Sequence, residues 1–248
     1  MIEILLIAGC FTIGFFFESI FGFGGGIIAY SILSFFIDLK TAIIAGFYVG
    51  TLSSLIIILT SYQHFEKKIF NKTVIISVFG SIVGVFCFVY FPVKILSLIF
   101  GVLLIFIALK NLFLEKKIDP QIEQELRNKK FGFLKIKLIF IGAMAQGAFG
   151  TGGPFIVNAL KYHFANKSSL RTTMSAYFLF CNFVRLPILI YKNEFNFDFF
   201  YKIYWIIIPV FMAIWLGHKV HLKISPHHFK IGIGIITLIA GLKFLFSN

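Results

Sequence analysis

Charged side chains are scarce in this sequence. Only 13% of its 248 residues are Asp, Glu, Lys or Arg, whereas 59% are hydrophobic. In a soluble domain roughly a quarter of the residues are charged, because these residues cover the surface. Here the apolar residues lie in long runs separated by short polar breaks, and no polar segment is long enough for a second, soluble domain. The sequence therefore predicts an all-α, polytopic membrane protein.

Acidic residues are much rarer than basic ones. The chain has 10 Asp and Glu against 23 Lys and Arg, which gives a net charge of +13. The basic residues lie between the apolar runs, and the sequence shows no basic amphipathic helix and no basic strand interleaved with aromatic residues. We therefore expect no nucleic-acid binding. Cationic loops beside apolar segments are typical of the positive-inside rule for membrane proteins.

Cysteine and histidine are too few and too scattered to predict a metal centre or a cofactor. Cys10, Cys87 and Cys181 are isolated within apolar runs and form no disulfide or metal-binding pattern. Four of the six histidines lie in the last polar loop: His218, His221, His227 and His228. Neighbouring lysines favour a solvated cationic loop there. The apolar segments contain no nucleophile with a neighbouring base, so we expect a protein that is not an enzyme.

Ten apolar segments follow one another along the chain. They cover about 2–20, 25–37, 41–62, 72–91, 93–112, 133–149, 153–164, 169–191, 198–217 and 228–246. Two of them, 25–37 and 153–164, are short. At 1.5 Å per residue they reach roughly 20 Å, against about 30 Å for the hydrocarbon core of a bilayer. We expect these two segments to be half-helices among about 8–10 membrane segments.

The chain contains an internal repeat. When residues 13–26 are laid over residues 141–154, an offset of 128 residues, six of fourteen positions match. The apolar segments that follow keep nearly the same offset, which a chance match between two glycine-rich stretches would not explain. The repeat predicts three regions: a first transmembrane repeat (1–112), a linker (113–132) and a second transmembrane repeat (133–248).

The basic residues predict that the two repeats are inverted. If each half crosses the membrane an odd number of times, 17 Lys and Arg lie on one side and five on the other, whereas an even number gives 14 and eight. The first split agrees better with the positive-inside rule, and it makes the repeats inverted, as in many secondary transporters. Each half then has a glycine-broken helix pair and three long transmembrane helices. The linker is expected in the cytoplasm and both termini in the periplasm. Whether the two arms of each pair cross or form a re-entrant hairpin stays open.

Two glycine motifs are the strongest candidates for a binding site. Their key residues are Gly24, Gly25 and Gly26 in the first half, and Gly152, Gly153 and Pro154 in the second. Broken backbone at membrane depth is tolerated only where it lines a cavity or is buried in protein. The helix that begins after each break directs free N–H groups and a positive dipole end toward an anion. Two such ends would converge near the midplane. The alternative is close helix packing through small residues.

Arg185 is the charge that most needs an explanation. It lies well inside the apolar segment 169–191, with Asn182 one helical turn earlier on the same face. A buried arginine is costly in a membrane unless it is paired, hydrated or able to reach the interface. We expect Asn182 and Arg185 to contact a substrate anion. A structural ion pair or a snorkelling arginine are the alternatives.

Three further residues are candidates for the same site. Glu18 precedes the first glycine motif and could carry a coupled proton, whereas its counterpart in the repeat, Gln146, is neutral. Glu18 could instead be the partner of Arg185 or a plain carboxylate at a helix end. The hydroxyls of Thr172 and Thr173 could bond oxyanion oxygens or bridge helices.

The paired motifs resemble the sulfite exporter TauE/SafE family, also called the toluene-sulfonate uptake permease family, over nearly the whole chain. The resemblance includes the length, the duplication and three further motifs: His64-Phe65-Glu66-Lys67, Arg171-Thr172-Thr173, and Asn182 followed by Arg185. It implies transport of small anions such as sulfite, sulfonates or sulfoacetate across the cytoplasmic membrane. The chain departs from the family pattern after the first glycine motif, where Tyr30 and Ser31 stand in place of a usual proline.

These observations predict a secondary transporter of a small, sulfur-containing anion in the cytoplasmic (inner) membrane. Its partners are the anion and the lipid bilayer, and coupling to protons or sodium and assembly as a homo-oligomer are left open. An anion channel of the same architecture is the first alternative, and an integral-membrane enzyme or a structural subunit of a larger complex are the others. No cofactor or metal is expected.

Overall fold

The computed structural model describes residues 2–21, 23–110, 112, 132–164, 166–220 and 226–246, with the side chains of 21, 220 and 226–233 left out. The described residues form only helices. The α-helices are α1 (Ile2–Phe21), α2 (Gly25–Leu33), α3 (Leu39–Ser61), α4 (Lys67–Tyr90), α5 (Val93–Leu109), α7 (Phe133–Phe149), α8 (Gly153–Leu160), α9 (Lys167–Tyr191), α10 (Phe197–Ile203), α11 (Ile207–Val220) and α12 (Pro226–Phe246). Short 3-10 turns cover Tyr62–His64, Lys161–His163 and Tyr204–Ile206. The predicted all-α fold is confirmed.

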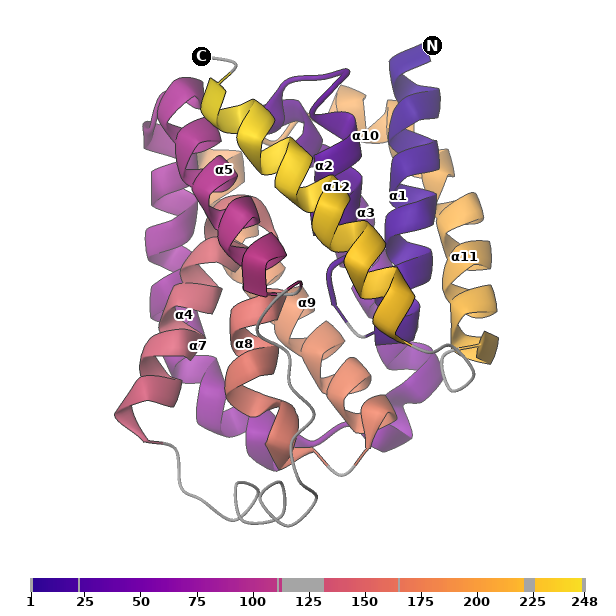
Figure 1. The fold of residues 1–248 in the computed structure, drawn as a ribbon, viewed down its shortest axis with the longest axis vertical. Coiled ribbons are helices and arrows are strands. Elements are labelled where there is room, and N and C mark those ends of the chain that lie inside the picture. Colours follow the sequence, from indigo (N-terminus) through magenta and orange to yellow (C-terminus); the bar gives the residue numbers. More distant parts are fainter. Residues whose placement is uncertain are drawn as a thin grey trace.

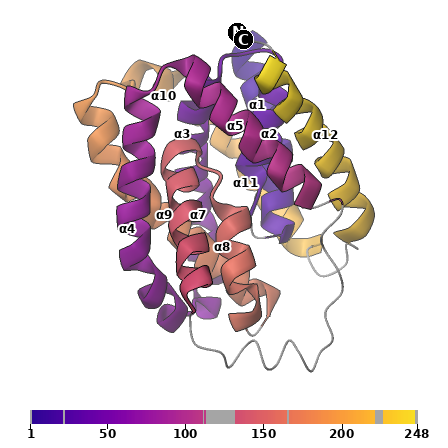
Figure 2. The same cartoon turned by 60° about the vertical axis from the view of Figure 1, so that its left-hand side comes forward.

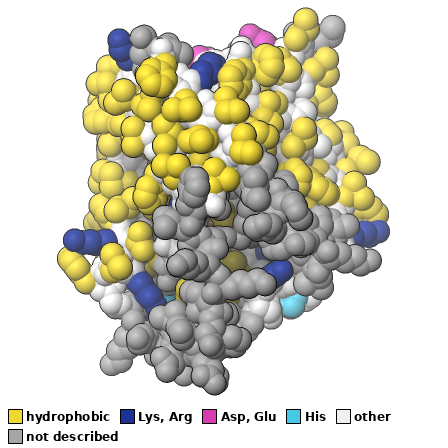
Figure 3. All heavy atoms as spheres, in the orientation of Figure 1, with side chains coloured by type: hydrophobic (Ala, Val, Ile, Leu, Met, Phe, Trp, Pro, Cys, Tyr) yellow, Lys and Arg dark blue, Asp and Glu magenta, His cyan; other side chains and the backbone are white. Residues whose placement is uncertain are grey.

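The outside of the helix bundle is apolar, as a protein surrounded by lipid requires. Within the described residues, five helical stretches are long and apolar enough to cross a membrane. They are Ile2–Ile20, Leu39–His64, Lys67–Tyr90, Lys167–Tyr191 and Phe197–Lys219. Large apolar side chains such as Phe79, Phe106 and Ile208 are more than half exposed. In Figure 3 hydrophobic side chains cover most of the described surface, and Lys and Arg lie toward its upper end and its lower half.

Both glycine-broken segments form hairpins. The N- and C-termini lie at the same end of the molecule in Figures 1 and 2, α1 begins at that end, and α7 begins at the opposite end. Gly14 of α1 faces the carbonyl group of Gly25, so α2 runs back beside α1. Gly142 of α7 faces Ile156 of α8 in the same way. The two arms of each pair therefore run antiparallel, and α1 is also long and apolar enough to cross a membrane.

Short polar and proline signals end and begin the helices. Asp38 accepts a hydrogen bond from the Thr41 N–H at the start of α3 (3.0 Å), and Asn166 accepts one from the Ser169 N–H at the start of α9 (2.8 Å). Such N-caps satisfy N–H groups that the helix itself cannot bond. The predicted segment 198–217 is interrupted at Tyr204–Ile206. Pro209 explains this, because its ring removes one N–H and clashes with the preceding turn.

The helices of the two halves interleave. α4 packs against α7, α1 against α11, α3 against α9, and α5 against α12. The pairings are symmetric if α1, α2, α3, α4 and α5 correspond in that order to α7, α8, α9, α11 and α12. The pair α4–α7 then corresponds to α11–α1, and the pairs α3–α9 and α5–α12 each join a helix to its own counterpart. The duplication and the domain boundaries stay predictions, and the expected linker 113–132 lies outside the described residues except for Gly132.

Candidate functional site

Each glycine hairpin is closed by one polar side chain. Oε2 of Glu18 on α1 accepts a hydrogen bond from the N–H of Gly25 at 2.9 Å. Oε1 of Gln146 on α7 accepts one from the N–H of Gly152 at 3.0 Å. The expectation that these N–H groups are free for an anion is therefore wrong for Gly25 and Gly152, because an oxygen of the protein already bonds them. The N–H groups of Gly26 and Gly153 are the next ones in the first turns of α2 and α8.

The two glycine motifs meet in the centre of the molecule. A Cβ atom placed on Gly26 would lie 3.4 Å from the carbonyl oxygen of Gly150. One placed on Gly153 would lie 2.8 Å from Cβ of Phe23. Gly24 and Gly150 have φ values of 97° and 70°, which L-residues with a side chain rarely adopt. The predicted convergence of the two helix ends is thus present in the structure, and glycine is needed on both sides of the contact. Gly22 lies outside the described residues.

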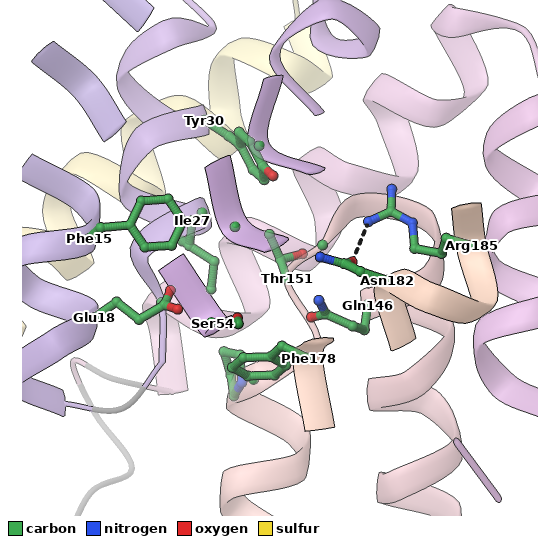
Figure 4. A pocket seen from close by; sticks show the side chains of 17 residues that line it. Phe15, Glu18, Ile27, Tyr30, Ser54, Gln146, Thr151, Phe178, Asn182 and Arg185 are labelled. Atoms are coloured by element: carbon green, nitrogen blue, oxygen red, sulfur yellow. Dashed lines mark hydrogen bonds between the residues drawn. The ribbon is translucent and has the colours of Figure 1, made fainter. Parts of the chain in front are cut away.

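A small cavity of about 30 Å³ lies between the motifs. Its lining comes from both hairpins and from α3 and α9, the pair of helices that cross between them. The lining residues are Phe15, Glu18, Gly24, Gly26, Ile27, Tyr30, Gly46, Gly50, Ser54, Gln146, Gly150, Thr151, Gly153, Pro154, Phe178, Asn182 and Arg185. In Figure 4 Glu18 lies on one side of this central pocket and Arg185 on the other, with Thr151 and Asn182 between them.

Arg185 is a fully buried cation without an acidic partner. Its side chain is 1% exposed, and among the described residues the one ion pair joins Lys40 to Glu194, at 3.0 Å. Nη1 of Arg185 donates a long hydrogen bond of 3.4 Å to Oδ1 of Asn182, and the guanidinium lies 5.3 Å from the centre of the Phe47 ring. These weak contacts do not replace the water that the cation loses. A further partner for Arg185 is therefore expected.

Three buried polar atoms on the lining residues have no hydrogen-bond partner among the residues that the structure describes. They are Nε and Nη2 of Arg185 and Oγ1 of Thr151. Buried polar atoms are almost always bonded, so unbonded ones in a cavity point to water or a ligand that completes the site. Two guanidinium N–H donors and a hydroxyl form a set that suits an oxyanion.

The structure does not bring Thr172 and Thr173 to this pocket. Oγ1 of Thr172 donates to the carbonyl oxygen of Ser61 (3.4 Å), and Oγ1 of Thr173 accepts from the N–H of Glu66 (3.0 Å). Both hydroxyls thus bond the connection between α3 and α4, as the alternative of a helix bridge predicted. They lie too near the start of α9 to reach the pocket, which meets α9 only from Phe178 onward.

The neighbouring Arg171 is a second buried arginine, but it has several acceptors. It donates to the carbonyl oxygen of Ser19 (3.1 Å) and to Oγ of Ser61 (2.8 Å), and its Nη2 lies 2.8 Å from Nδ1 of His218. Arg171 therefore connects α9 to α1, α3 and α11 and has a structural role. Of the loop histidines, only His218 is described with its side chain. In the described part of the chain, no three His, Cys, Asp or Glu residues form a group that could hold a metal ion.

Sequence reasoning missed two glycines of the pocket wall on α3. Gly46 and Gly50 line the cavity and, with Ser54, recur every fourth residue. The ring of Tyr30 packs against Gly46, so a side chain at position 46 would collide with it. The regular spacing of these small residues was the feature of the sequence that could have indicated a pocket wall on α3. Thr151 was also missed as a lining residue, although it stands within the second glycine motif.

Comparison with known protein families matches residues 5–244 to the family described as sulfite exporter TauE/SafE. The match covers essentially the whole chain. A search of curated proteins and a search of solved structures gave no match. The resemblance inferred from the glycine motifs is confirmed at the level of the family.

Proposed function

Because the chain belongs to the sulfite exporter TauE/SafE family, a family of membrane transporters and not of enzymes, we propose that it is a secondary transporter of a small anion bound in the central pocket. The protein is a multi-pass membrane protein, and its family implies a small-molecule substrate and a lipid bilayer around it. The proposed substrate is a sulfur-containing anion such as sulfite, a sulfonate or sulfoacetate. The proposed location is the cytoplasmic (inner) membrane.

The unpaired guanidinium of Arg185 is the observation that carries this proposal. An isolated cation at membrane depth is expensive, so it is retained where it serves transport. The unbonded Nε and Nη2 atoms can form a bidentate contact with two oxygens of one anion. Asn182 holds Nη1 through its amide oxygen, which leaves the other side of the fork for the substrate.

The two short helices add a second attraction for negative charge. α2 and α8 both begin at the pocket, and the N-terminal end of a helix carries a partial positive charge. Gly26, Gly153 and Pro154 line the cavity at these ends. Two half-helices that meet at a substrate site near the midplane are the arrangement found in secondary transporters with inverted repeats.

Glu18 suggests how transport is coupled. It is the one acidic residue among those that line the pocket, and its side chain is 6% exposed. An anion and an ionised carboxylate repel each other more strongly in a small buried pocket than in bulk water, because the surrounding protein has a lower dielectric constant. A proton on Glu18 removes this repulsion, so the anion and a proton are proposed to occupy the pocket together.

The proposal is tested with purified protein in liposomes and radiolabelled sulfite. We expect uptake that saturates with sulfite concentration, since each anion occupies one site, whereas an anion channel would not saturate. Arg185→Ala should weaken sulfite binding about tenfold or more, because a charge-assisted hydrogen bond contributes about 1.5–3 kcal/mol. Arg185→Lys should retain part of the affinity, since it keeps the charge and loses the fork.

Arg171→Lys is the matched control on the same helix. Its acceptors lie on α1, α3 and α11 and not in the pocket. We expect this variant to lower the melting temperature and to leave the sulfite affinity of the folded protein unchanged. Normal transport by Arg185→Ala would contradict the proposed site, and failure of the wild-type protein to bind any small anion would contradict the proposed function.

A further inference from the structure

A second cavity lies beside the central pocket, on the side of α10. It has a volume of about 170 Å³, is open on the side of the exposed Phe183, and is lined chiefly by aromatic and aliphatic side chains, among them Phe47 and Phe200. Asn182 lines this apolar cavity and the central pocket alike. A polar space with room for a few water molecules, at about 10–15 Å³ each, thus adjoins a much larger apolar space.

A short chain of hydrogen bonds separates the two cavities. The hydroxyl of Thr51 donates to the carbonyl oxygen of Phe47 at 2.6 Å, so its oxygen is free to accept from Nδ2 of Asn182 at 2.9 Å. The amide oxygen of Asn182 then faces Nη1 of Arg185 (3.4 Å), a contact that Figure 4 shows as a dashed line. In this chain the choice of donor and acceptor in one bond determines the next. A primary amide has its N–H donors on one side and its accepting oxygen on the other, so Asn182 donates to Thr51 and accepts from Arg185.

The ring of Phe47 strengthens the same wall. It lies below the Arg185 guanidinium at 5.3 Å and also lines the apolar cavity. Asn182 and Phe47 are each 4% exposed. The hydrogen bond from Asn182 to Thr51 and the contact of the Phe47 ring with Arg185 hold the two side chains in place in front of the apolar cavity. An anion on Arg185 therefore meets these two side chains in the direction of α10.

We propose that the Thr51–Asn182 hydrogen bond determines the size of the anion that the transporter accepts. This inference rests on the proposed function. With the bond in place, the central pocket admits a compact oxyanion such as sulfite and excludes one that carries a bulky apolar group. Without it, the two cavities become one, and an apolar group attached to the anion enters the aromatic cavity. Specificity then comes from a barrier to the larger anion and not from a contact with the smaller one.

The test compares how sulfite, methanesulfonate and benzenesulfonate displace radiolabelled sulfite from purified protein. We expect wild type to bind sulfite at least about tenfold more tightly than benzenesulfonate, which is a usual range for steric discrimination by a pocket. Thr51→Ala removes the hydrogen bond and opens the wall. It should raise the affinity for benzenesulfonate about tenfold and leave that for sulfite unchanged.

Two matched variants show whether the wall itself is responsible. Thr51→Ser keeps the hydroxyl and should keep the preference of the wild type. Leu52 lines only the apolar cavity, so Leu52→Trp added to Thr51→Ala should fill that space and cancel the gain for benzenesulfonate. Equal affinity of the wild type for all three anions, or an unchanged preference in Thr51→Ala, would overturn the proposal while sulfite binding still supports the anion site. Absence of binding for all three anions would overturn both.

Discussion

Glu18 and Gln146 show how one residue changes the chemistry of two otherwise similar hairpins. Both side chains accept a hydrogen bond from a glycine N–H at the break, at 2.9 Å and 3.0 Å. The hydrogen bond alone needs only an oxygen, which an amide supplies as well as a carboxylate. The acid in the first half therefore has a role that the cap does not explain, and proton coupling is the role proposed for it.

The variant Glu18→Gln separates the two roles. It copies the second hairpin, so the bond to Gly25 and the melting temperature should be retained. If Glu18 carries the coupled proton, a pH gradient that is more acidic on the side from which sulfite enters should accelerate sulfite uptake by the wild type. The same gradient should have no effect on uptake by the variant. Uptake into liposomes with and without the gradient measures this. A variant that still responds to the gradient would show that the proton, if one moves, is carried elsewhere.

At the scale of elements, the glycines at and near each break meet three different structural requirements, and each requirement recurs in both halves. Gly14 and Gly142 allow the arms of each hairpin to approach, and Gly26 and Gly153 allow the two hairpins to touch. Gly24 and Gly150 permit the left-handed backbone that turns the chain. Both of the last two line the pocket, which makes them a matched pair.

Alanine at these two positions should distinguish backbone strain from loss of the binding site. Each substitution strains a backbone with positive φ and should cost about 1 kcal/mol of stability. A Cβ atom at Gly24 has no atom within 4 Å, whereas one at Gly150 lies 3.6 Å from Nη1 of Arg185 and 3.2 Å from the Tyr30 hydroxyl. We therefore expect both variants to melt earlier, and only Gly150→Ala to bind sulfite more weakly. Melting curves and sulfite titrations measure the two effects, and equal losses of affinity would contradict the placement of the anion beside Arg185.

At the scale of the whole molecule, contacts between distant parts of the chain join α3 to α9, and to the segment that follows α9, at both ends of the helix pair. At one end Lys40 on α3 pairs with Glu194 after α9 (3.0 Å), and Tyr48 bonds the backbone of Asn196. At the other end Ser61 on α3 accepts from Arg171 on α9. The central pocket lies between these two sets of contacts, which hold α3 and α9 together on either side of it.

The orientation of the molecule in the membrane follows from the asymmetry of its basic residues. We expect the end with both termini and α10 to face the periplasm and the end with the start of α4 to face the cytoplasm. In a background with the three cysteines replaced by serine, an impermeant thiol reagent added to intact cells should label Asp198→Cys and not Lys68→Cys. Both positions are exposed. Labelling of Lys68→Cys alone would reverse the orientation, and labelling of both would contradict the odd number of crossings.

Local composition was sufficient to predict the class of protein and the breaks at the two glycine motifs, and the resemblance of those motifs to a known family predicted the family. A bilayer leaves long apolar runs no alternative to helices, a cluster of glycines within a few residues breaks such a helix, and a lone arginine in an apolar run needs a partner wherever the run is placed. These properties depend on neighbours in the chain. The short segments therefore begin where the glycine motifs predict, at Gly25 and Gly153.

The partners of each polar residue depend on how the helices are rotated and packed, and only the tertiary structure decided them. Thr151 lines the pocket whereas Thr172 bonds Ser61, more than a hundred residues away. Two arginines of one helix differ in the same way, since Arg171 meets three other helices and Arg185 meets a cavity. The wall between the polar and apolar cavities joins Thr51 to Asn182 across 131 positions of sequence. The hydropathy of a segment indicates whether it forms a helix in the lipid, but it contains no information on which face of one helix packs against which face of another.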